Sequence, residues 1–261
     1  MPNDETEQDR LDMHHEIMLI ITSRKLYQAP VSNISRILDL GTGTGIWAID
    51  CADFHPEAEV IGLDLSPIQP PFVPPNCRFE VDDFELHWTY PKKYFDFIHG
   101  RNIVTSMKDI MDTLEQVKQH LKPGGYFELA ELGWEIFSDD NTLEDSWAPK
   151  RCSDLGREAM RKLGRPVPTA EWLEQTLNDS GFLDVEVETW KQPMGRWPKA
   201  KELKKAGSLF TMSAETGYHA YYMALLTRVH GWKSEDADEL CKKAYAAHCD
   251  TKSGVHAYSL L

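Results

Sequence analysis

Short apolar runs alternate with segments of helical apolar spacing over the first half of the chain. The helical spacing predicts helices over three segments: 13–26, 46–54 and 107–121. Apolar runs bounded by turn residues predict buried strands at five places: 34–40, 60–65, 78–83, 95–100 and 126–132. Strands of this kind, separated by crossovers, are typical of a parallel sheet covered by helices on both faces. We therefore expect a Rossmann-like α/β fold.

Two segments rich in proline or glycine interrupt this alternation. The crossover at 66–76 reads SPIQPPFVPPN, and its prolines are incompatible with a regular helix, so we expect an extended loop there. The residues LKPGG at 121–125 predict the end of a helix followed by a turn.

The alternation of short apolar runs with helical segments ends after Trp134. Two further helices are predicted at 152–163 and 170–180, and an alternating segment at 181–190 predicts a strand. Helical spacing is then nearly continuous from 199 to 248, with a break near Gly231. These patterns divide the chain into four expected parts: an N-terminal helical segment (1–33), an α/β domain that binds the cofactor (34–198), a helical lid or acceptor region (199–252) and a closing strand of the sheet (253–261).

The composition of the chain argues against some classes of binding partner. The chain has 28 basic and 42 acidic residues, a net charge of −14, which argues against a protein that grips nucleic acid through its phosphates. No apolar run approaches the length of a membrane span, and the acidic N-terminus does not resemble a signal peptide, so we expect a cytoplasmic protein. The five cysteines are scattered without a CxxC pair, which favours reduced thiols and no metal site.

A strand that runs into Gly41, Gly43 and Gly45 is the first candidate site. Such glycines let the backbone turn tightly and approach a ligand at the positive end of the following helix. A tight turn without a ligand is the alternative interpretation. Dinucleotide-binding proteins use a similar turn, but their fingerprint needs glycine where this chain has Ile46. Asp39 instead matches the acidic residue of the E/DxGxGxG motif in class I methyltransferases.

Acidic residues also end the next two strands. Asp64 closes the second strand, where a carboxylate can accept both hydroxyls of a ribose, although a turn or N-cap role is the alternative. Asp82 and Asp83 close the third strand, and we favour Asp83 as the acceptor of an adenine amino group because Phe84 can then cover the adenine face. An acidic pair at a strand end is also typical of an ordinary turn.

The ends of the fourth and fifth strands should lie near the reacting group, because ligands bind at the carboxyl ends of strands in open α/β sheets. Arg101 is a candidate partner for a ligand carboxylate. His99 is either a general base or a packing residue, and Glu131 leaves the same two alternatives open. The complete predicted site for S-adenosylmethionine (SAM) consists of Asp39, Gly41, Thr42, Gly43, Asp64, Leu65, Asp83, Phe84 and Arg101, with His99 as the catalytic candidate.

These residues resemble the fungal LaeA-like class I methyltransferases. The resemblance extends over nearly the whole chain, through the segments EQDRLDMHHEIMLIITSRKLYQAPV, DLSPIQPPFVPPNCRFEVDDFE, LKPGGYFELAEL, GFLDVEVETWKQPMGRWPK and VHAY. It implies a seven-stranded Rossmann-like sheet with helices on both faces and an added helical lid. It also implies SAM as the cofactor, bound at positions that match Gly41, Gly43, Asp64, Asp83 and Arg101.

The first functional interpretation is SAM-dependent methylation of a small molecule of fungal secondary metabolism. Aromatic residues in and beside the helical region suggest an apolar or aromatic acceptor, in a pocket that includes Trp197, Tyr218 and Tyr222, although these rings are equally compatible with an ordinary core. One alternative is a regulatory protein that works through protein partners, which would favour a nuclear location. Another is pericyclase-type chemistry on a methyltransferase fold, with SAM as a structural ligand.

Overall fold

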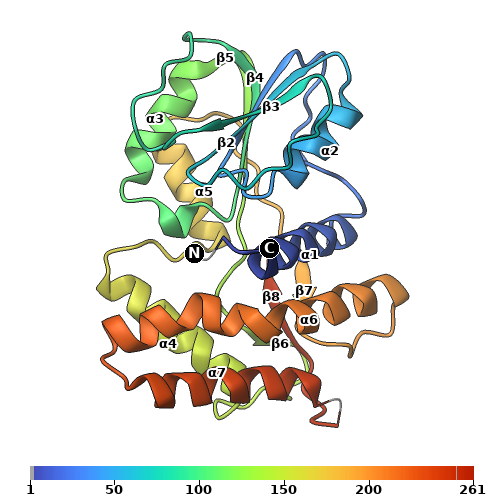
Figure 1. The fold of residues 1–261 in the computed structure, drawn as a ribbon, viewed down its shortest axis with the longest axis vertical. Coiled ribbons are helices and arrows are strands. Elements are labelled where there is room, and N and C mark those ends of the chain that lie inside the picture. The colour runs from blue at the N-terminus through green and yellow to red at the C-terminus, as the bar shows by residue number, and fades with distance from the viewer. Residues whose placement is uncertain (1–2, 251) are drawn as a thin grey trace. The chain divides into compact units, whose positions relative to one another are not determined.

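The computed structural model describes residues 3–250 and 252–261, and it divides the chain into two compact units (Figure 1). The sheet unit consists of residues 25–131 and 169–188, and the helical unit consists of residues 3–24, 132–168, 189–250 and 252–261. Each unit combines segments that are distant in the sequence. The boundaries therefore differ from the four continuous parts expected above, because compactness follows side-chain packing and not chain continuity.

The sheet unit contains five parallel strands in the order β3-β2-β1-β4-β5 (Figure 1). The strands are β1 (Arg36–Leu40), β2 (Glu59–Asp64), β3 (Cys77–Val81), β4 (Phe95–Arg101) and β5 (Leu121–Ala130). Every strand predicted for the first half of the chain is present, and the Rossmann-like α/β fold is confirmed.

Helices cover both faces of this sheet because successive side chains of β1 point to opposite sides. Leu38 and Leu40 belong to one apolar cluster, which also contains Val117 of α3 (Ile110–His120). Ile37 belongs to a second cluster, which contains Trp47 of α2 (Ile46–Phe54). Figure 1 shows α3 and α2 on opposite sides of the strands. The unit is completed by a short 3₁₀ turn, η1 (Val104–Ser106), and by α5 (Ala170–Asp179).

The proline-rich segment 66–76 and the segment 121–125 compare differently with their predictions. Residues 66–76 form neither helix nor strand, as their prolines predict. The segment 121–125 ends α3 as predicted, but it lies within β5, where it produces an irregularity between the pairs Phe95–Leu121 and Phe97–Tyr126. Gly124 accommodates this bend with a φ of 79°.

The expected seven-stranded sheet is not formed by the described residues. Segment 181–190 was expected to be a strand, but it has no regular structure, and its apolar Leu183 is 87% exposed. The last strand, β8 (Ala257–Leu260), pairs antiparallel with β6 (Phe137–Ser138) and β7 (Lys191–Pro193) in a separate three-stranded sheet of the helical unit. Since both edges of β8 are paired in this small sheet, it does not close the parallel one.

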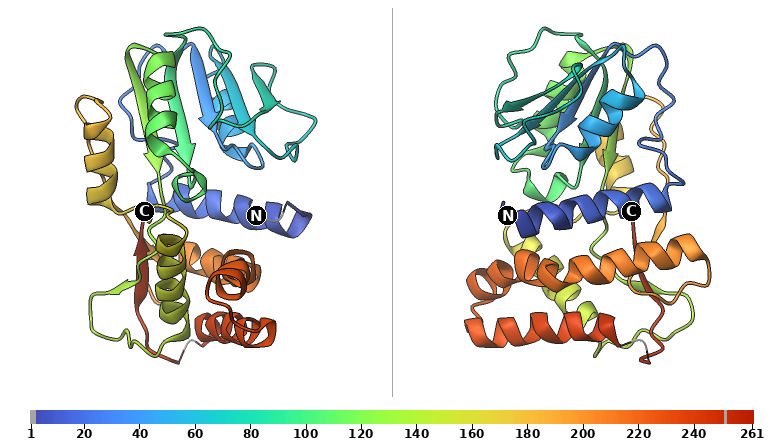
Figure 2. Two further views of the ribbon diagram at one scale, coloured as in Figure 1. Left: turned by 90° about the vertical axis from the view of Figure 1, so that its left-hand side faces the viewer. Right: turned by 45° about the vertical axis from the view of Figure 1, so that its right-hand side comes forward.

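The helical unit is built around α1 (Glu5–Ile21), α4 (Ala148–Lys162), α6 (Lys201–Ala224) and α7 (Ser234–Cys249). Figure 2 shows α1 along α6, and α6 along α7. Helix α1 begins eight residues earlier than the apolar pattern predicts, because the Asp4 carboxylate accepts a hydrogen bond from the Glu7 amide at 2.9 Å and caps it.

The break expected near Gly231 is present in this unit. A π-helical turn, η2 (Leu225–Val229), follows α6, and Gly231 has a φ of 72° before α7 begins. No helix in the described part of the chain is long and apolar enough to cross a membrane.

Candidate functional site

The glycine turn joins β1 to α2 at the carboxyl edge of the parallel sheet. Gly41 has a φ of 65°, and a Cβ atom placed on it would lie 2.5 Å from Cγ2 of Ile103, so only glycine fits without displacement. The turn is held by two backbone bonds: the Thr42 amide donates to the Leu63 carbonyl at 3.0 Å, and the Gly45 amide donates to the Thr42 carbonyl at 2.9 Å. The turn is therefore fixed to β2 as well as to α2.

Asp64, at the tip of β2, fastens the glycine turn. Its Oδ2 accepts a hydrogen bond from the Gly43 amide at 2.8 Å, and its Oδ1 accepts one from the Ser66 amide at 2.9 Å. A carboxylate offers about four acceptor positions, so both oxygens retain capacity for a ligand's hydroxyl groups. The next side chain, Leu65, is 66% exposed and provides an apolar surface beside this carboxylate.

The loop after β3 lies against the same turn. The Asp82 amide donates to the Asp64 carbonyl at 3.2 Å, which brings the ends of β2 and β3 together. Asp83 is half-buried, and its Oδ1 accepts a hydrogen bond from the Glu85 amide at 3.0 Å. The ring of Phe84 lies 3.7 Å from the position of a Cβ on Gly41. The structure thus brings together the glycine turn, Asp64, Asp83 and Phe84.

The side chains of Asp39 and Thr42 are bonded to each other inside the protein. Both are buried, and the Thr42 hydroxyl donates to Oδ2 of Asp39 at 2.5 Å. The other oxygen of Asp39, Oδ1, lies 2.7 Å from Nδ1 of His99. The sequence motif is therefore present, but these two side chains bond within the protein instead of facing a ligand.

His99, the catalytic candidate of the sequence analysis, is enclosed by its neighbours. It is only 1% exposed, its ring stacks on the Trp47 indole with centroids 3.7 Å apart, and Nδ1 is engaged by Asp39. The indole in turn donates from Nε1 to the Leu26 carbonyl at 2.8 Å. These contacts favour the packing role over the role of a general base.

Arg101 ends β4, and Glu131 directly follows β5, the strand beside it. Arg101 is half-buried in register with Ala130, at the edge where a ligand carboxylate is expected. Glu131 follows β5 and is 7% exposed, and its Oε1 accepts hydrogen bonds from the amides of Ile103 (2.8 Å) and Val104 (3.0 Å). Burial raises the pKa of Glu131 to about 7, although these two amides act in the opposite direction. This carboxyl is therefore able to change protonation near neutral pH.

Gln69 is a residue of the site that the sequence analysis missed. Its Nε2 donates to the carbonyls of Gly43 (2.7 Å) and Ser66 (2.9 Å), so it joins the proline-rich loop to the glycine turn. Gln69 and Asn76 are the two amide side chains of the proline-rich segment 66–76, and such side chains among prolines were a signal that this loop has a fixed position.

The three residues expected to form an acceptor pocket all lie in the helical unit. Tyr218 and Tyr222 stack on each other with centroids 5.7 Å apart and belong to its apolar core. Trp197 donates from Nε1 to the Ala257 carbonyl at 2.9 Å. The packing of the two tyrosines favours the core role that the sequence left open for them.

The edge of the sheet unit fits a nucleoside with an additional charged group. The Asp64 carboxylate, the apolar side chain of Leu65 and the glycine turn lie side by side, which suits a ribose and a base. Comparison with known proteins identifies the class. A family model described as a methyltransferase domain matches residues 12–187.

Two curated relatives cover most of the chain. Methyltransferase pytC of Aspergillus terreus is 42% identical over 90% of this chain and 73% of its own length. The secondary metabolism regulator LAE1 of Cochliobolus heterostrophus is 37% identical over 99% of this chain and 86% of its own length. The chain belongs to the LaeA-like fungal methyltransferases.

A solved methyltransferase has the same fold. Phosphoethanolamine N-methyltransferase 2 of Haemonchus contortus, determined with SAM, matches 93% of this chain and 50% of its own, with a TM-score of 0.51 and 18% identity. The cofactor of this LaeA-like methyltransferase is SAM. The fit rests on the open turn at Gly41 and on the Asp64 carboxylate beside exposed Leu65.

Proposed function

We propose that this methyltransferase transfers a methyl group from SAM to a small apolar or aromatic acceptor of fungal secondary metabolism. The observation that carries the proposal is the bond between Asp64 and the Gly43 amide, which holds the hydroxyl-binding carboxylate and the glycine turn as one rigid cradle. The similarity to pytC, whose name describes a methyltransferase, supports the reaction class. When bound, SAM supplies an electrophilic methyl group on a sulfonium.

Each residue at the sheet edge has an expected role. Asp64 accepts the ribose hydroxyls, and Asp83 accepts the adenine amino group. Leu65 and Phe84 cover the faces of the base, and Arg101 pairs with the carboxylate of the methionine portion. Because the turn at Gly41 is already fixed by its own hydrogen bonds, little ordering is required when the ligand binds.

Glu131 is the proposed proton acceptor in place of His99. Its Oε1 is held by two amides, so its Oε2 is the oxygen that we propose meets the substrate. With its pKa near 7, the carboxylate takes a proton from an acceptor hydroxyl on Oε2 and releases it to water after the product leaves. An acceptor that carries no proton at neutral pH would not need this group.

Calorimetry with SAM and S-adenosylhomocysteine tests the cofactor site. Asp64→Ala should weaken SAM binding by at least about tenfold, since it removes a charge-assisted bond and releases the turn. Asp53→Ala is the matched control, because Asp53 is an exposed carboxylate on α2 away from the cradle. Unchanged SAM affinity in Asp64→Ala would refute the site, and absence of SAM binding to the unmodified protein would refute the proposed function.

A regulatory role is the second candidate, because LAE1 is named as a regulator of secondary metabolism and is similar over almost the whole chain. In that case the protein acts through protein partners and its location is nuclear, whereas the first proposal expects a cytoplasmic enzyme. Turnover of a pathway metabolite by purified protein, without any partner recovered from fungal extracts, favours the enzyme. Failure of turnover together with a specific partner favours the regulator.

A further inference from the structure

Two side chains hold the same pair of backbone segments at the carboxyl edge of the parallel sheet. The Asp64 carboxylate accepts hydrogen bonds from the amides of Gly43 (2.8 Å) and Ser66 (2.9 Å), one on each oxygen. Nε2 of Gln69 donates to the carbonyls of the same two residues, at 2.7 Å and 2.9 Å. Asp64 thus binds the N–H groups of this pair and Gln69 binds its C=O groups. These residues form the clamp: Gly43, Asp64, Ser66 and Gln69.

The backbone at Gly43 depends on the clamp for its orientation. Gly43 has a φ of 58°, in the left-handed region that glycine enters without steric cost. Since glycine populates both signs of φ, hydrogen bonds at its N–H and C=O groups must fix it here. Ser66 is less dependent, because its carbonyl also accepts the Ile68 amide at 2.9 Å and the following Pro67 restricts its backbone. The bond from Gln69 to the Gly43 carbonyl is therefore the critical contact.

Gln69 is presented by a stiff segment of the proline-rich loop 66–76. Pro70 and Pro71 follow it, and a residue that precedes proline is restricted to an extended backbone. The end of the loop is fixed by the second amide side chain, Asn76. Its Nδ2 donates at 2.9 to 3.0 Å to three carbonyls at and after the end of α2: those of Ala52, His55 and Ala58. Gln69 therefore fastens the loop to the turn before α2, and Asn76 fastens it beyond the end of that helix.

We propose that Gln69 is a positioning residue for the ribose of SAM, an inference that rests on the proposed cofactor site. By holding Gly43 and Ser66 in place, Gln69 keeps one amide on each oxygen of Asp64. Each oxygen then offers a lone pair to one of the two ribose hydroxyls. Without Gln69 the Gly43 amide is no longer held on Oδ2, and the carboxylate loses a bond that sets its rotation. Gln69 acts through Asp64 and needs no contact of its own with the ligand.

Calorimetry with S-adenosylhomocysteine and its 2′,3′-dideoxy analogue tests this role, because the two ligands differ only in the ribose hydroxyls. The unmodified protein should bind S-adenosylhomocysteine at least about tenfold more tightly than the analogue, since the hydroxyls donate to a charged acceptor. Gln69→Met keeps the length of the side chain and removes the donor. It should reduce this hydroxyl preference to about threefold or less, while the affinity for the analogue changes little.

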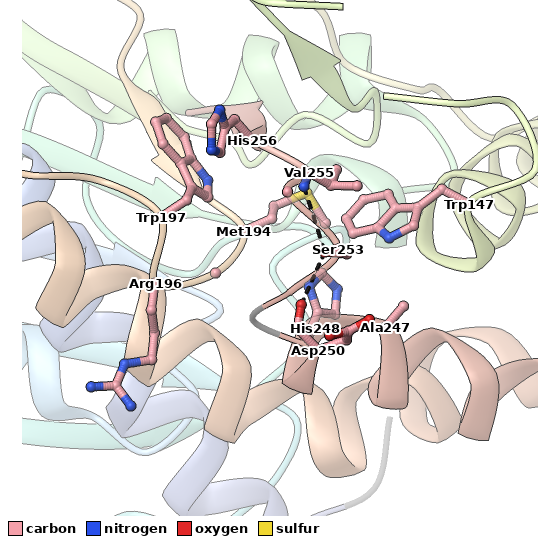
Figure 3. A pocket seen from close by; sticks show the side chains of 12 residues that line it. Trp147, Met194, Arg196, Trp197, Ala247, His248, Asp250, Ser253, Val255 and His256 are labelled. Carbon is pink, nitrogen blue, oxygen red and sulfur yellow. Dashed lines mark hydrogen bonds between the residues drawn. The ribbon is translucent and has the colours of Figure 1, made fainter. Parts of the chain in front are cut away.

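Two control variants separate positioning from a general loss of stability. Asn76→Ala removes the other amide that fastens the same loop, so it should lower the melting temperature and keep the hydroxyl preference. Met194→Ala removes a buried side chain from the wall of a cavity of about 170 Å³ (Figure 3). All residues that line this cavity belong to the helical unit, and none belongs to the clamp. Met194→Ala should likewise lower the melting temperature and keep the hydroxyl preference.

The inference is overturned if Gln69→Met retains the full hydroxyl preference, or if both control variants lose it to the same degree. Gln69→Glu is the second variant if Gln69→Met does not fold. Its ionised carboxylate has the same shape and no proton to donate, so retention of the preference there also overturns the inference. Absence of S-adenosylhomocysteine binding to the unmodified protein overturns the cofactor site and this inference with it. Binding with a hydroxyl preference that does not depend on Gln69 overturns this inference alone.

Discussion

Replacing Glu131 by glutamine should stabilise the folded protein at neutral and alkaline pH. The glutamine carbonyl oxygen has the same shape and can accept the two bonds from the Ile103 and Val104 amides. What the substitution removes is the cost of holding a charge at a position that is only 7% exposed. The side chain is more readily ionised in the unfolded chain than in the folded one.

The size of the effect follows from the pKa of this carboxyl. The value rises from 4.5 to about 7 on folding, and each unit corresponds to about 1.4 kcal/mol, so the ionised side chain costs the folded state about 3 kcal/mol. Below pH 4.5 the group is protonated in both states and this cost is absent. Between pH 4.5 and 7 unfolding releases a proton, so the stability of the unmodified protein falls relative to Glu131→Gln, and above pH 7 the difference is constant.

Denaturant unfolding of both proteins between pH 4 and 8.5 measures this difference. Glu128→Gln is the matched control. Glu128 lies on β5 and also accepts hydrogen bonds from two backbone amides, those of Gln28 and Ala29, but it is half-buried, so the same substitution should not stabilise the protein. Parallel stability curves for Glu131→Gln and the unmodified protein would refute the reasoning. Methyl transfer to a hydroxyl acceptor should nevertheless fall in Glu131→Gln, because the proton acceptor is lost.

Three further substitutions test other residues of the sheet unit. His99→Ala should lower the free energy of unfolding by about 3 kcal/mol, because it leaves the buried Asp39 without its ring partner. The affinity of the folded protein for SAM should change little, which calorimetry at low temperature measures. Gly41→Ala should lower the free energy of unfolding by at least about 1–2 kcal/mol, because the backbone at this position is left-handed. It should also weaken SAM binding as Ile103 is displaced. Thermal unfolding measures the loss of stability, and calorimetry measures the loss of affinity. Leu65→Ser should weaken SAM binding a few-fold, since we expect this exposed side chain to make its main contact with the ligand. Its melting temperature should stay within about 1 °C of the value for the unmodified protein. A large drop in melting temperature would contradict this expectation.

Local sequence signals were sufficient for the elements of the sheet unit. The helix at 46–54 has the predicted limits, and the five parallel strands lie within a few residues of their predicted positions. The prolines of 66–76 excluded a helix there for a local reason, the fixed φ and the missing N–H. The strand expected at 181–190 is absent because alternation only describes a segment that could form a strand, and strands also need a partner edge.

The sequence by itself determined the parallel sheet, the glycine turn and the acidic residues at the strand tips, because each depends on periodicity or on backbone conformations that few residue types allow. Tertiary structure decided which polar side chains remain available to a ligand. It buried His99 against Trp47 and Asp39, and it placed Glu131 on two amides. Desolvation and hydrogen-bond satisfaction depend on neighbours that are distant in the chain, so no local pattern reveals them.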